Sequence, residues 1–382
     1  GFIVDFTLAN ARILCKGNVF SGGINIRNGI IYSITTGNSV PLGAVDCEGD
    51  YICPGLIELH TDNLERHIQP RPGVNWPLDA SIIAHDRELA GNGITTVFDA
   101  VRVGSITSNT AAGYDKYARE TVTKINRLVA SQALKISHYI HLRAEICSET
   151  LIEEVDEFTH EDRLKMISIM DHTPGQRQFR DEGKLVEYLS NKNSMNDQEI
   201  AEHFQMLKSL QTNFAQIHRN HVKIKANSLN ILLASHDDTT LEDVVCSAED
   251  GCTLAEFPTT LEAAKFCREY RISIMMGTPN LVRGVSHSGN ISARELASKG
   301  LIDILSSDYI PSSLLMGAVK LGLIRKNLAL GLQSVTQFPA EAAGLEDRGT
   351  IEVGKRADLL RFCISREQPK IKTVWCEGIQ IA

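Results

Sequence analysis

Short, nearly continuous apolar runs recur through the middle of the chain, separated by stretches with helical periodicity. Such runs predict parallel strands that helices cover on both faces of the sheet. Eight of them favour a closed barrel over an open doubly wound sheet. The expected strands are Leu56–Leu59, Thr95–Asp99, Ser137–Arg143, Met166–Met170, Leu229–Ser235, Thr253–Phe257, Ile272–Met276 and Asp303–Ser307.

The two ends of the chain have a different pattern, in which β-rich runs follow one another closely between Gly and Asn turns. This spacing is typical of a small antiparallel unit. The expected runs are Phe2–Ala9, Ala11–Cys15, Gly23–Arg27, Ile30–Thr35, Thr350–Val353, Ala357–Cys363 and Thr373–Cys376. We therefore predict an α/β fold with a distorted (β/α)8 TIM barrel over residues 54–348. A small β-sandwich domain is expected from both chain termini, over residues 1–53 and 349–382.

One segment, Thr173–Asn227, interrupts this alternation. It begins with Gly, Arg and Asn clusters and continues into a long polar helical pattern over Asp197–Ile217. The segment is too long for a simple loop between a strand and a helix. It is either a lid over a site or a solvated excursion on the surface.

The composition narrows the class of protein. The chain has 382 residues, of which 43% are hydrophobic and 23% charged, as in an ordinary globular protein. A net charge of −8 argues against a broad nucleic-acid surface, and no apolar run approaches the ~20 residues of a membrane span. Nine dispersed cysteines and a start unlike a secretory signal predict reduced thiols and a cytoplasmic location. A homo-oligomer stays possible.

Histidines and carboxylates follow the ends of several expected strands. In a barrel, these carboxyl ends share one face, which is where the active site lies. Imidazole and carboxylate together suit zinc, manganese or iron better than calcium. A single His there is as often an ordinary hydrogen-bonded residue, but the joint placement favours a metal centre. The candidate metal ligands are His60, Asp62, Glu145, His172, His236 and Asp308.

Four blocks of the chain resemble the amidohydrolase superfamily: Pro54–Asp62 (PGLIELHTD), Gly93–Val97 (GITTV), Ser306–Asp308 (SSD) and Gly349–Leu359 (GTIEVGKRADL). The resemblance implies a distorted barrel, a small β-sandwich from the termini, and one or two divalent ions, zinc first and manganese or iron next. The superfamily usually has His-x-His where this chain has His60-Thr61-Asp62. It often has a carboxylated lysine as a metal bridge, a place for which this chain offers Glu145.

Within the superfamily, longer blocks resemble the PhnM family of the carbon–phosphorus lyase pathway. They are His60–Glu65, Pro70–Pro72, Asp171–Gln178, Ala234–Asp238, Ala255–Thr260 and Val282–Asn290. The resemblance implies hydrolysis of α-D-ribose 1-methylphosphonate 5-triphosphate to the 5-phosphate and pyrophosphate.

This reaction leads to a hypothesis about the roles of the candidate residues. Glu145 would bridge two ions, with His60, Asp62 and Asp308 at one and His172 and His236 at the other. Asp308 would accept a proton from the attacking water. Arginine offers paired donors to phosphate, so the expected substrate-binding residues are Arg71, Arg177 and Arg283, together with His287, Ser288 and Asn290 in a Gly-flanked loop.

Other polar residues near the strand ends have more than one interpretation. Asp237 either orients a metal-bound His or caps the next helix, and for Asp238 we prefer the cap. Glu256 either enters the site or orients an Arg. Two other functions stay open: hydrolysis of an amide or other C–N bond, the commoner chemistry of the superfamily, and a metal-free scaffold. Whether nucleoside triphosphates are also substrates stays open too.

Overall fold

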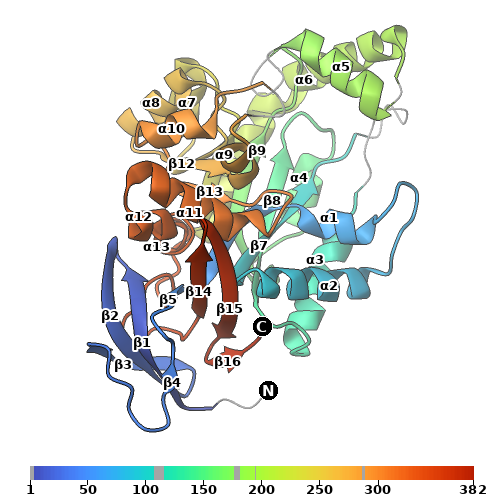
Figure 1. Ribbon diagram of the computed structural model, residues 1–382. Coiled ribbons are helices and arrows are strands. Elements are labelled where there is room, and N and C mark those ends of the chain that lie inside the picture. The colour runs from blue at the N-terminus through green and yellow to red at the C-terminus, as the bar shows by residue number, and fades with distance from the viewer. Residues whose placement is uncertain (1–3, 107–115, 176–180, 194, 286–288) are drawn as a thin grey trace.

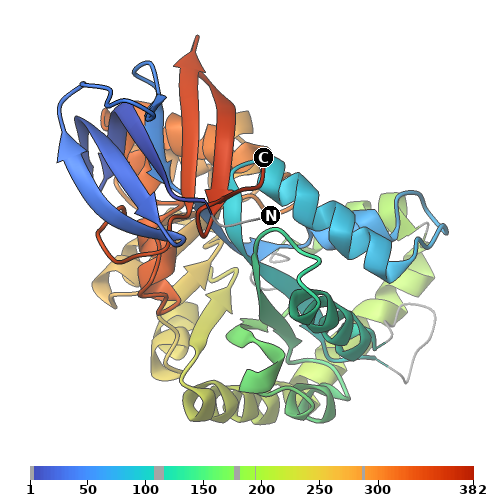
Figure 2. The same ribbon diagram turned by 90° about the horizontal axis from the view of Figure 1, so that it is seen from below.

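The computed structural model describes residues 4–106, 116–175, 181–193, 195–285 and 289–382. Within them the chain forms two large sheets (Figure 1). The first is a ring of parallel strands from the middle of the chain, surrounded by helices. The second is built from the two ends of the chain, and Figure 2 shows it beside the ring.

The ring is the predicted barrel, and all eight expected strands occur in it. Neighbouring strands pair in the order β13-β12-β11-β10-β9-β8-β7-β6. The strands are β6 (Leu56–Thr61), β7 (Ile94–Val103), β8 (Ser137–Glu145), β9 (Leu164–Met170), β10 (Leu232–His236), β11 (Leu254–Glu256), β12 (Ser273–Gly277) and β13 (Ile304–Ser306).

A side chain helps to close the ring between its first and last strands. The backbone pairs there through a single bridge, from Thr61 to Asp308. Below that bridge the fully buried carboxylate of Glu58 accepts hydrogen bonds from the backbone N–H of His60 at 2.9 Å and of Ser307 at 2.6 Å. The hydroxyl of Ser306 donates to the same carboxylate at 2.8 Å. Glu58 thus replaces part of the missing ladder between β6 and β13.

Apolar side chains fill the ring below its carboxyl end. They come from most of the strands and are almost fully buried: Ile57, Leu59, Phe98, Met166, Ala234, Leu254, Met275 and Ile304. The barrel is therefore a packed core and not a pore, as its architecture requires. The polar residues at the carboxyl ends stand on this apolar floor.

The outer layer of the barrel is helical. Its helices are α1 (Asn63–Ile68), α2 (Leu78–Gly91), α3 (Ala118–Ala130), α4 (Leu151–Asp156), α7 (Leu241–Glu249), α8 (Leu261–Glu269), α9 (Thr278–Arg283), α10 (Ala293–Ser298), α11 (Ser313–Arg325), α12 (Leu328–Gln333) and α13 (Gln337–Ala342), with a 3-10 turn at His160–Asp162. Thr240 caps α7, since its hydroxyl accepts from the N–H of Asp243. The expectation that Asp238 is the cap is wrong: its carboxylate accepts from the Ser247 hydroxyl at 2.8 Å.

The segment that interrupts the barrel is a helical hairpin. It consists of α5 (Glu182–Asn193) and α6 (Asp197–Leu229), so the long helix predicted over Asp197–Ile217 is confirmed and extends further. Residues of α5 and of the start of α6 form a separate apolar cluster. Val222 and Ala226, near the end of α6, pack against the helices and strands of the barrel. Figure 1 shows α5 and the start of α6 extending away from the ring. In the described part of the chain, no helix combines the length and apolar character needed to cross a membrane.

The second sheet joins the two ends of the chain, as predicted. It has the order β16-β15-β14-β5-β1-β2-β3, with β4 beside β1. Its strands are β1 (Phe6–Cys15), β2 (Asn18–Arg27), β3 (Ile30–Thr36), β4 (Val45–Asp46), β5 (Tyr51–Pro54), β14 (Leu359–Ser365), β15 (Gln368–Cys376) and β16 (Ile379–Gln380). The antiparallel pair of β5 and β14 connects the N-terminal half to the C-terminal half.

Two details of this sheet differ from the prediction. The runs expected before and after Asn10 form one strand, β1, with an irregular register between Leu8 and Ala11. Asn10 has a φ of 54° there, a left-handed conformation that Asn tolerates. The prediction of a strand at Thr350–Val353 is wrong, because the segment bends and turns. The ammonium of Lys355, just after it, donates to the Thr350 hydroxyl at 2.7 Å.

Candidate metal centre at the carboxyl ends of the barrel strands

The six metal ligands expected from the sequence all lie at the carboxyl end of the barrel. Two of them end a strand, Glu145 in β8 and His236 in β10. His60 lies one residue before the end of β6 and Asp62 one residue after it, whereas His172 and Asp308 follow β9 and β13 by two residues. The barrel therefore gathers the six, and its strands add further residues of the same kinds.

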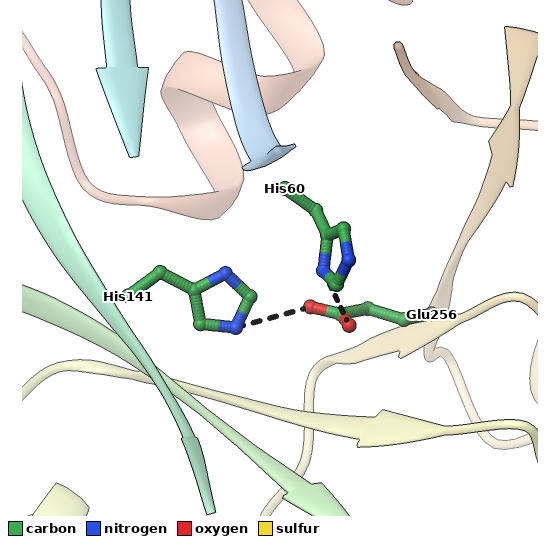
Figure 3. Close-up of side chains that lie close together, drawn as sticks. All are labelled: His60, His141 and Glu256. Carbon is green, nitrogen blue, oxygen red and sulfur yellow. Dashed lines mark ion pairs between the residues drawn. The ribbon is translucent and has the colours of Figure 1, made fainter. Parts of the chain in front are cut away.

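The deeper group contains His60, His141 and Glu256 (Figure 3). His60 Nδ1 lies 3.1 Å from Glu256 Oε2, and His141 Nε2 lies 3.4 Å from Glu256 Oε1. All three residues are buried, and their ligand atoms lie within 4.8 Å of one another. One carboxylate thus faces two imidazoles from strands β6 and β8.

The hydrogen bonds of His141 leave its inward nitrogen available as a ligand atom. Its Nδ1 donates to the Leu59 carbonyl at 3.0 Å, and its Nε2 faces the Ser168 hydroxyl and Glu256. Burial lowers the pKa of His141 to about 3, so the ring is neutral at physiological pH. A neutral imidazole whose other nitrogen is held by a carbonyl is the usual form of a metal-binding His.

His60 Nδ1, Asp62 Oδ1 and Glu256 Oε2 are buried and make no well-aligned hydrogen bond among the described residues, although the first and the third lie 3.1 Å apart. Such atoms are rare in folded proteins because each costs about 1–3 kcal/mol. Burial alone would raise the pKa of Glu256, but His60, His141 and His236 lower it well below its usual range. The deeper group therefore presents an ionised carboxylate next to imidazole nitrogens, and Asp62 adds a buried oxygen without an aligned donor, which fits a bound cation.

The shallower group contains His172, His236 and Asp237, with Glu145 beside it. Glu145 Oε1 lies 2.9 Å from His172 Nδ1, and Asp237 Oδ2 lies 2.7 Å from His236 Nδ1. The second contact fits the orienting role considered for Asp237, and α7 is capped by Thr240 instead. The other nitrogen of His236, Nε2, lies 3.7 Å from Glu256 Oε2, so His236 connects the two groups.

Asp308 lies at the edge of the deeper group. Its Oδ1 is 3.8 Å from His60 Nε2, and its side chain keeps 28% of its exposure. Burial is the main reason that the pKa of Asp308 is raised; Asp62 raises it too, while His60 and Arg143 oppose the shift. A carboxylate with a raised pKa next to a ligand His is well placed to accept a proton.

Three residues just beyond strand ends have left-handed backbone conformations: Asp237 (φ 57°), Phe257 (φ 55°) and Asp308 (φ 55°). Asp tolerates this region, whereas a bulky side chain such as Phe is rarely found there. The Phe257 ring meets those of His60 and His236 edge-on, at centroid distances of 5.2 and 5.4 Å. This backbone conformation places the ring against both imidazoles, and strained residues cluster at functional sites.

The structure places only part of the expected substrate-binding set. Arg71 is exposed in a turn after α1, where it bridges to Val74, and Arg283 is exposed in the last turn of α9. Asn290 is partly buried. Arg177, His287 and Ser288 lie outside the described residues.

Sequence reasoning missed His141 and Arg143 and left Glu256 open. A signal was present for the first two: residues 141, 143 and 145 alternate along β8, so they share the face on which Glu145 was expected. For Glu256 the strand is only three residues long, and its inward face depends on the neighbouring strands.

Comparisons with known proteins agree with this architecture. The profile of the amidohydrolase family matches residues 77–380, and the chain belongs to this family. It is 38% identical over 379 residues to the alpha-D-ribose 1-methylphosphonate 5-triphosphate diphosphatase of Escherichia coli (strain K12), covering 97% of this chain and 99% of that protein. The resemblance to the PhnM family is thereby confirmed.

Solved structures of distant relatives confirm the fold. Dihydropyrimidinase from Brevibacillus agri NCHU1002 has a TM-score of 0.63 and 12% identity, covering 99% of this chain and 95% of that one. N-acetylglucosamine-6-phosphate deacetylase from Thermotoga maritima has a TM-score of 0.61 and 12% identity, covering 99% of both chains. At this identity the likeness concerns the fold alone.

Proposed function

We propose that the protein hydrolyses α-D-ribose 1-methylphosphonate 5-triphosphate to the corresponding 5-phosphate and pyrophosphate, a step of phosphonate catabolism. One observation carries the proposal: the 38% identity to a diphosphatase of that substrate runs over nearly the whole of both chains. The gathering of histidines and carboxylates at the carboxyl end of the barrel supports a hydrolytic site in the same place.

The site would hold one or two divalent ions. The proposed ligands are His60, Asp62, Glu145, His172, His236 and Asp308, to which the geometry adds His141, Asp237 and Glu256. Mixed imidazole and carboxylate donors suit zinc best, and manganese or iron would also fit. Such ions polarise water and phosphoryl oxygens and stabilise the charge that develops on them. The orphaned atoms of His60, Asp62 and Glu256 support an ion at the deeper group first.

Asp308 would act as the base. It would accept a proton from the water that attacks the α-phosphorus, while the anhydride bond to the β-phosphate breaks and pyrophosphate leaves. Phe257 would fix the orientation of His60 and His236 by packing against both rings. Arg71, Arg177, Arg283, His287, Ser288 and Asn290 would bind the outer part of the substrate.

Two further expectations belong to this proposal. We propose that the enzyme acts in the cytoplasm, where thiols stay reduced; the nine cysteines, all in described residues, are not joined by disulfides. The alternative of C–N bond hydrolysis has the amidohydrolase family match and the distant fold likeness in its favour, whereas the relative that matches over nearly the whole chain is a diphosphatase. The buried ligand atoms speak against a metal-free scaffold.

The test is to incubate the metal-loaded protein with the ribosyl triphosphate and to separate the phosphate products. Pyrophosphate and the ribosyl 5-phosphate in equal amounts are expected. Release of single phosphates would place the attack at the γ-phosphorus and contradict the proposal. Dihydrouracil and N-acetylglucosamine 6-phosphate serve as C–N substrates in parallel, and faster turnover of either would favour the alternative.

A further inference from the structure

Two arginines lie side by side inside the barrel, close to the candidate metal centre. Arg102 in β7 and Arg143 in β8 are direct partners in the parallel ladder. Arg143 stands between His141 and Glu145 along β8, and side chains two residues apart point to the same face of a strand. Arg143 therefore points into the carboxyl end of the barrel, where both of those residues lie.

The guanidinium of Arg143 is anchored on one side and open on the other. Its Nε donates to the Met170 sulfur at 3.3 Å. Within the described part of the chain, no hydrogen bond reaches its two terminal nitrogens, and the residue keeps part of its exposure. A guanidinium stays protonated in proteins, and the carboxylates of Asp62, Glu65 and Glu145 interact with it electrostatically. The group is a fixed cation with two N–H₂ groups available to a ligand.

The surroundings of Arg102 hold the second guanidinium in place. It lies over the Tyr117 ring at 5.1 Å, and its Nη1 donates to the Gly104 carbonyl at 2.5 Å. Tyr117 is itself fixed, because its hydroxyl accepts from the Arg102 backbone N–H at 2.8 Å. Like charges opposite each other in a ladder repel. Glu65 and Glu145 interact electrostatically with both guanidinium groups and offset this repulsion in the ligand-free protein.

We propose that Arg143, with Arg102 beside it, binds the phosphoryl oxygens of the triphosphate at the metal centre. The inference rests on the proposed function and names the substrate contact that the sequence did not reveal. The planar fork of arginine offers two parallel donors to one phosphoryl group, a geometry that an ammonium group lacks. The two arginines would also attract a polyanion locally, although the chain as a whole has a net charge of −8.

Arg143→Met and Arg143→Lys test this inference in the metal-loaded enzyme. Arg127→Met is the matched control, because Arg127 is exposed on α3. The binding of inorganic tripolyphosphate is measured by calorimetry, and kcat and KM are measured from pyrophosphate release. We expect Arg143→Met to weaken tripolyphosphate binding at least tenfold and to lower kcat/KM at least a hundredfold. Metal content should stay unchanged, and the control should match the wild type.

Arg143→Lys separates phosphate binding from simple charge balance. If Arg143 only neutralises Asp62, Glu65 and Glu145, Lys restores the wild-type constants, and the proposal is overturned. If it binds phosphate through two donors, Lys stays about tenfold below the wild type. Wild-type kinetics in Arg143→Met would also overturn it. A wild-type enzyme that releases no pyrophosphate would instead contradict the proposed function, whereas loss of tripolyphosphate binding in Arg143→Met would still support the phosphate subsite.

Discussion

Glu256 Oε2 lies 3.1 Å from His60 Nδ1, with both side chains buried, although one residue ends β11 and the other lies in β6. The same carboxylate faces His141 and His236. A single carboxylate thus contacts imidazoles from three other strands. It is the residue through which the deeper and the shallower groups of ligands meet.

Glu256→Gln should remove the metal from the deeper group. The amide keeps the shape of the side chain but loses the negative charge opposite the imidazoles. We expect bound metal to fall by about half or more, and kcat by about a hundredfold or more, because a charged ligand is lost. Metal analysis after gel filtration and pyrophosphate release measure the two effects. Glu262→Gln, at an exposed position of α8, is the control; full metal content in Glu256→Gln would remove Glu256 from the ligand set.

Asp308→Asn should abolish turnover while the metal stays bound. An amide cannot accept the proton of the attacking water, and loss of a general base costs about 10²–10⁴ in rate. Pyrophosphate release and metal content are measured on the same sample. Asp303→Asn, at the start of the same strand segment and paired with Arg268, should keep the wild-type rate. A rate within threefold of the wild type in Asp308→Asn would exclude the role of base.

His138→Gln should destabilise the barrel wall without touching the site. His138 lies between two buried carboxylates, with Nδ1 2.7 Å from Asp99 Oδ2 and Nε2 2.9 Å from Asp86 Oδ1. Removal of the cation takes away the charge between two buried carboxylates, although Asp99 keeps His85 and Asp86 keeps the backbone N–H of Ile136, so the cost is up to about 3–5 kcal/mol. Urea unfolding with excess chelator measures the change, because metal release then does not contribute. His160→Gln, at an exposed position, should change the free energy of unfolding by less than about 0.5 kcal/mol.

The contacts of His138 with Asp99 and Asp86 also predict how the stability of the protein depends on pH. Burial lowers the pKa of His138, but Asp99 and Asp86 outweigh it and raise the pKa from 6.5 to about 9. A raised His pKa means that the folded state binds the proton more tightly than the unfolded state. The stabilisation is therefore fully present below pH 6.5 and is lost as the pH rises through about 9. His138→Gln should show a flatter profile between these values; an equal slope in both proteins would show that another group titrates.

Removal of metal should lower the stability of the wild-type protein. An ion that binds only the folded state stabilises it by about 3 kcal/mol at a free concentration one hundred times its Kd. Chelation should therefore shift the urea midpoint downward, and added zinc should restore it. The Glu256→Gln variant should show a smaller shift than the wild type. An unchanged midpoint after complete chelation would argue against a metal at the buried orphan atoms.

The sequence was sufficient to predict the barrel and to predict that the candidate ligands lie at the carboxyl end of its strands. Every expected barrel strand occurs, because buried parallel strands have continuous apolar runs that differ clearly from the amphipathic helices between them. The strand-end position of residues such as His172 and Asp308 follows directly from those boundaries. The sequence could not show which ligands share a point, since this depends on the stagger between strands that are distant in the chain.

The incorrect and missed predictions also concern features that depend on contacts between distant parts of the chain. Asp238 was a reasonable helix cap by residue type, but α7 begins two residues later at the Thr240 cap. Thr350–Val353 is β-rich in composition, yet it is not a strand; backbone pairing with β3 starts only at Gly354, whose N–H donates to the Ile31 carbonyl. Arg143 was overlooked because a cation inside a strand has an ordinary structural explanation. Its open terminal nitrogens are visible only in three dimensions.

At Asp237 and Asp308, where the backbone is left-handed, the residue that favours stability differs from the residue that activity needs. Such a conformation costs most L-residues about 1–2 kcal/mol and Asp less than that, whereas glycine adopts it freely. A screen of random variants for heat resistance alone, carried out with excess chelator so that metal binding does not contribute, would therefore accumulate glycine at these two positions and recover well-folded, inactive proteins. Selection for growth on a phosphonate would retain both aspartates. The two selections diverge at the same codons, so the chain should become more heat-stable wherever its activity is no longer needed.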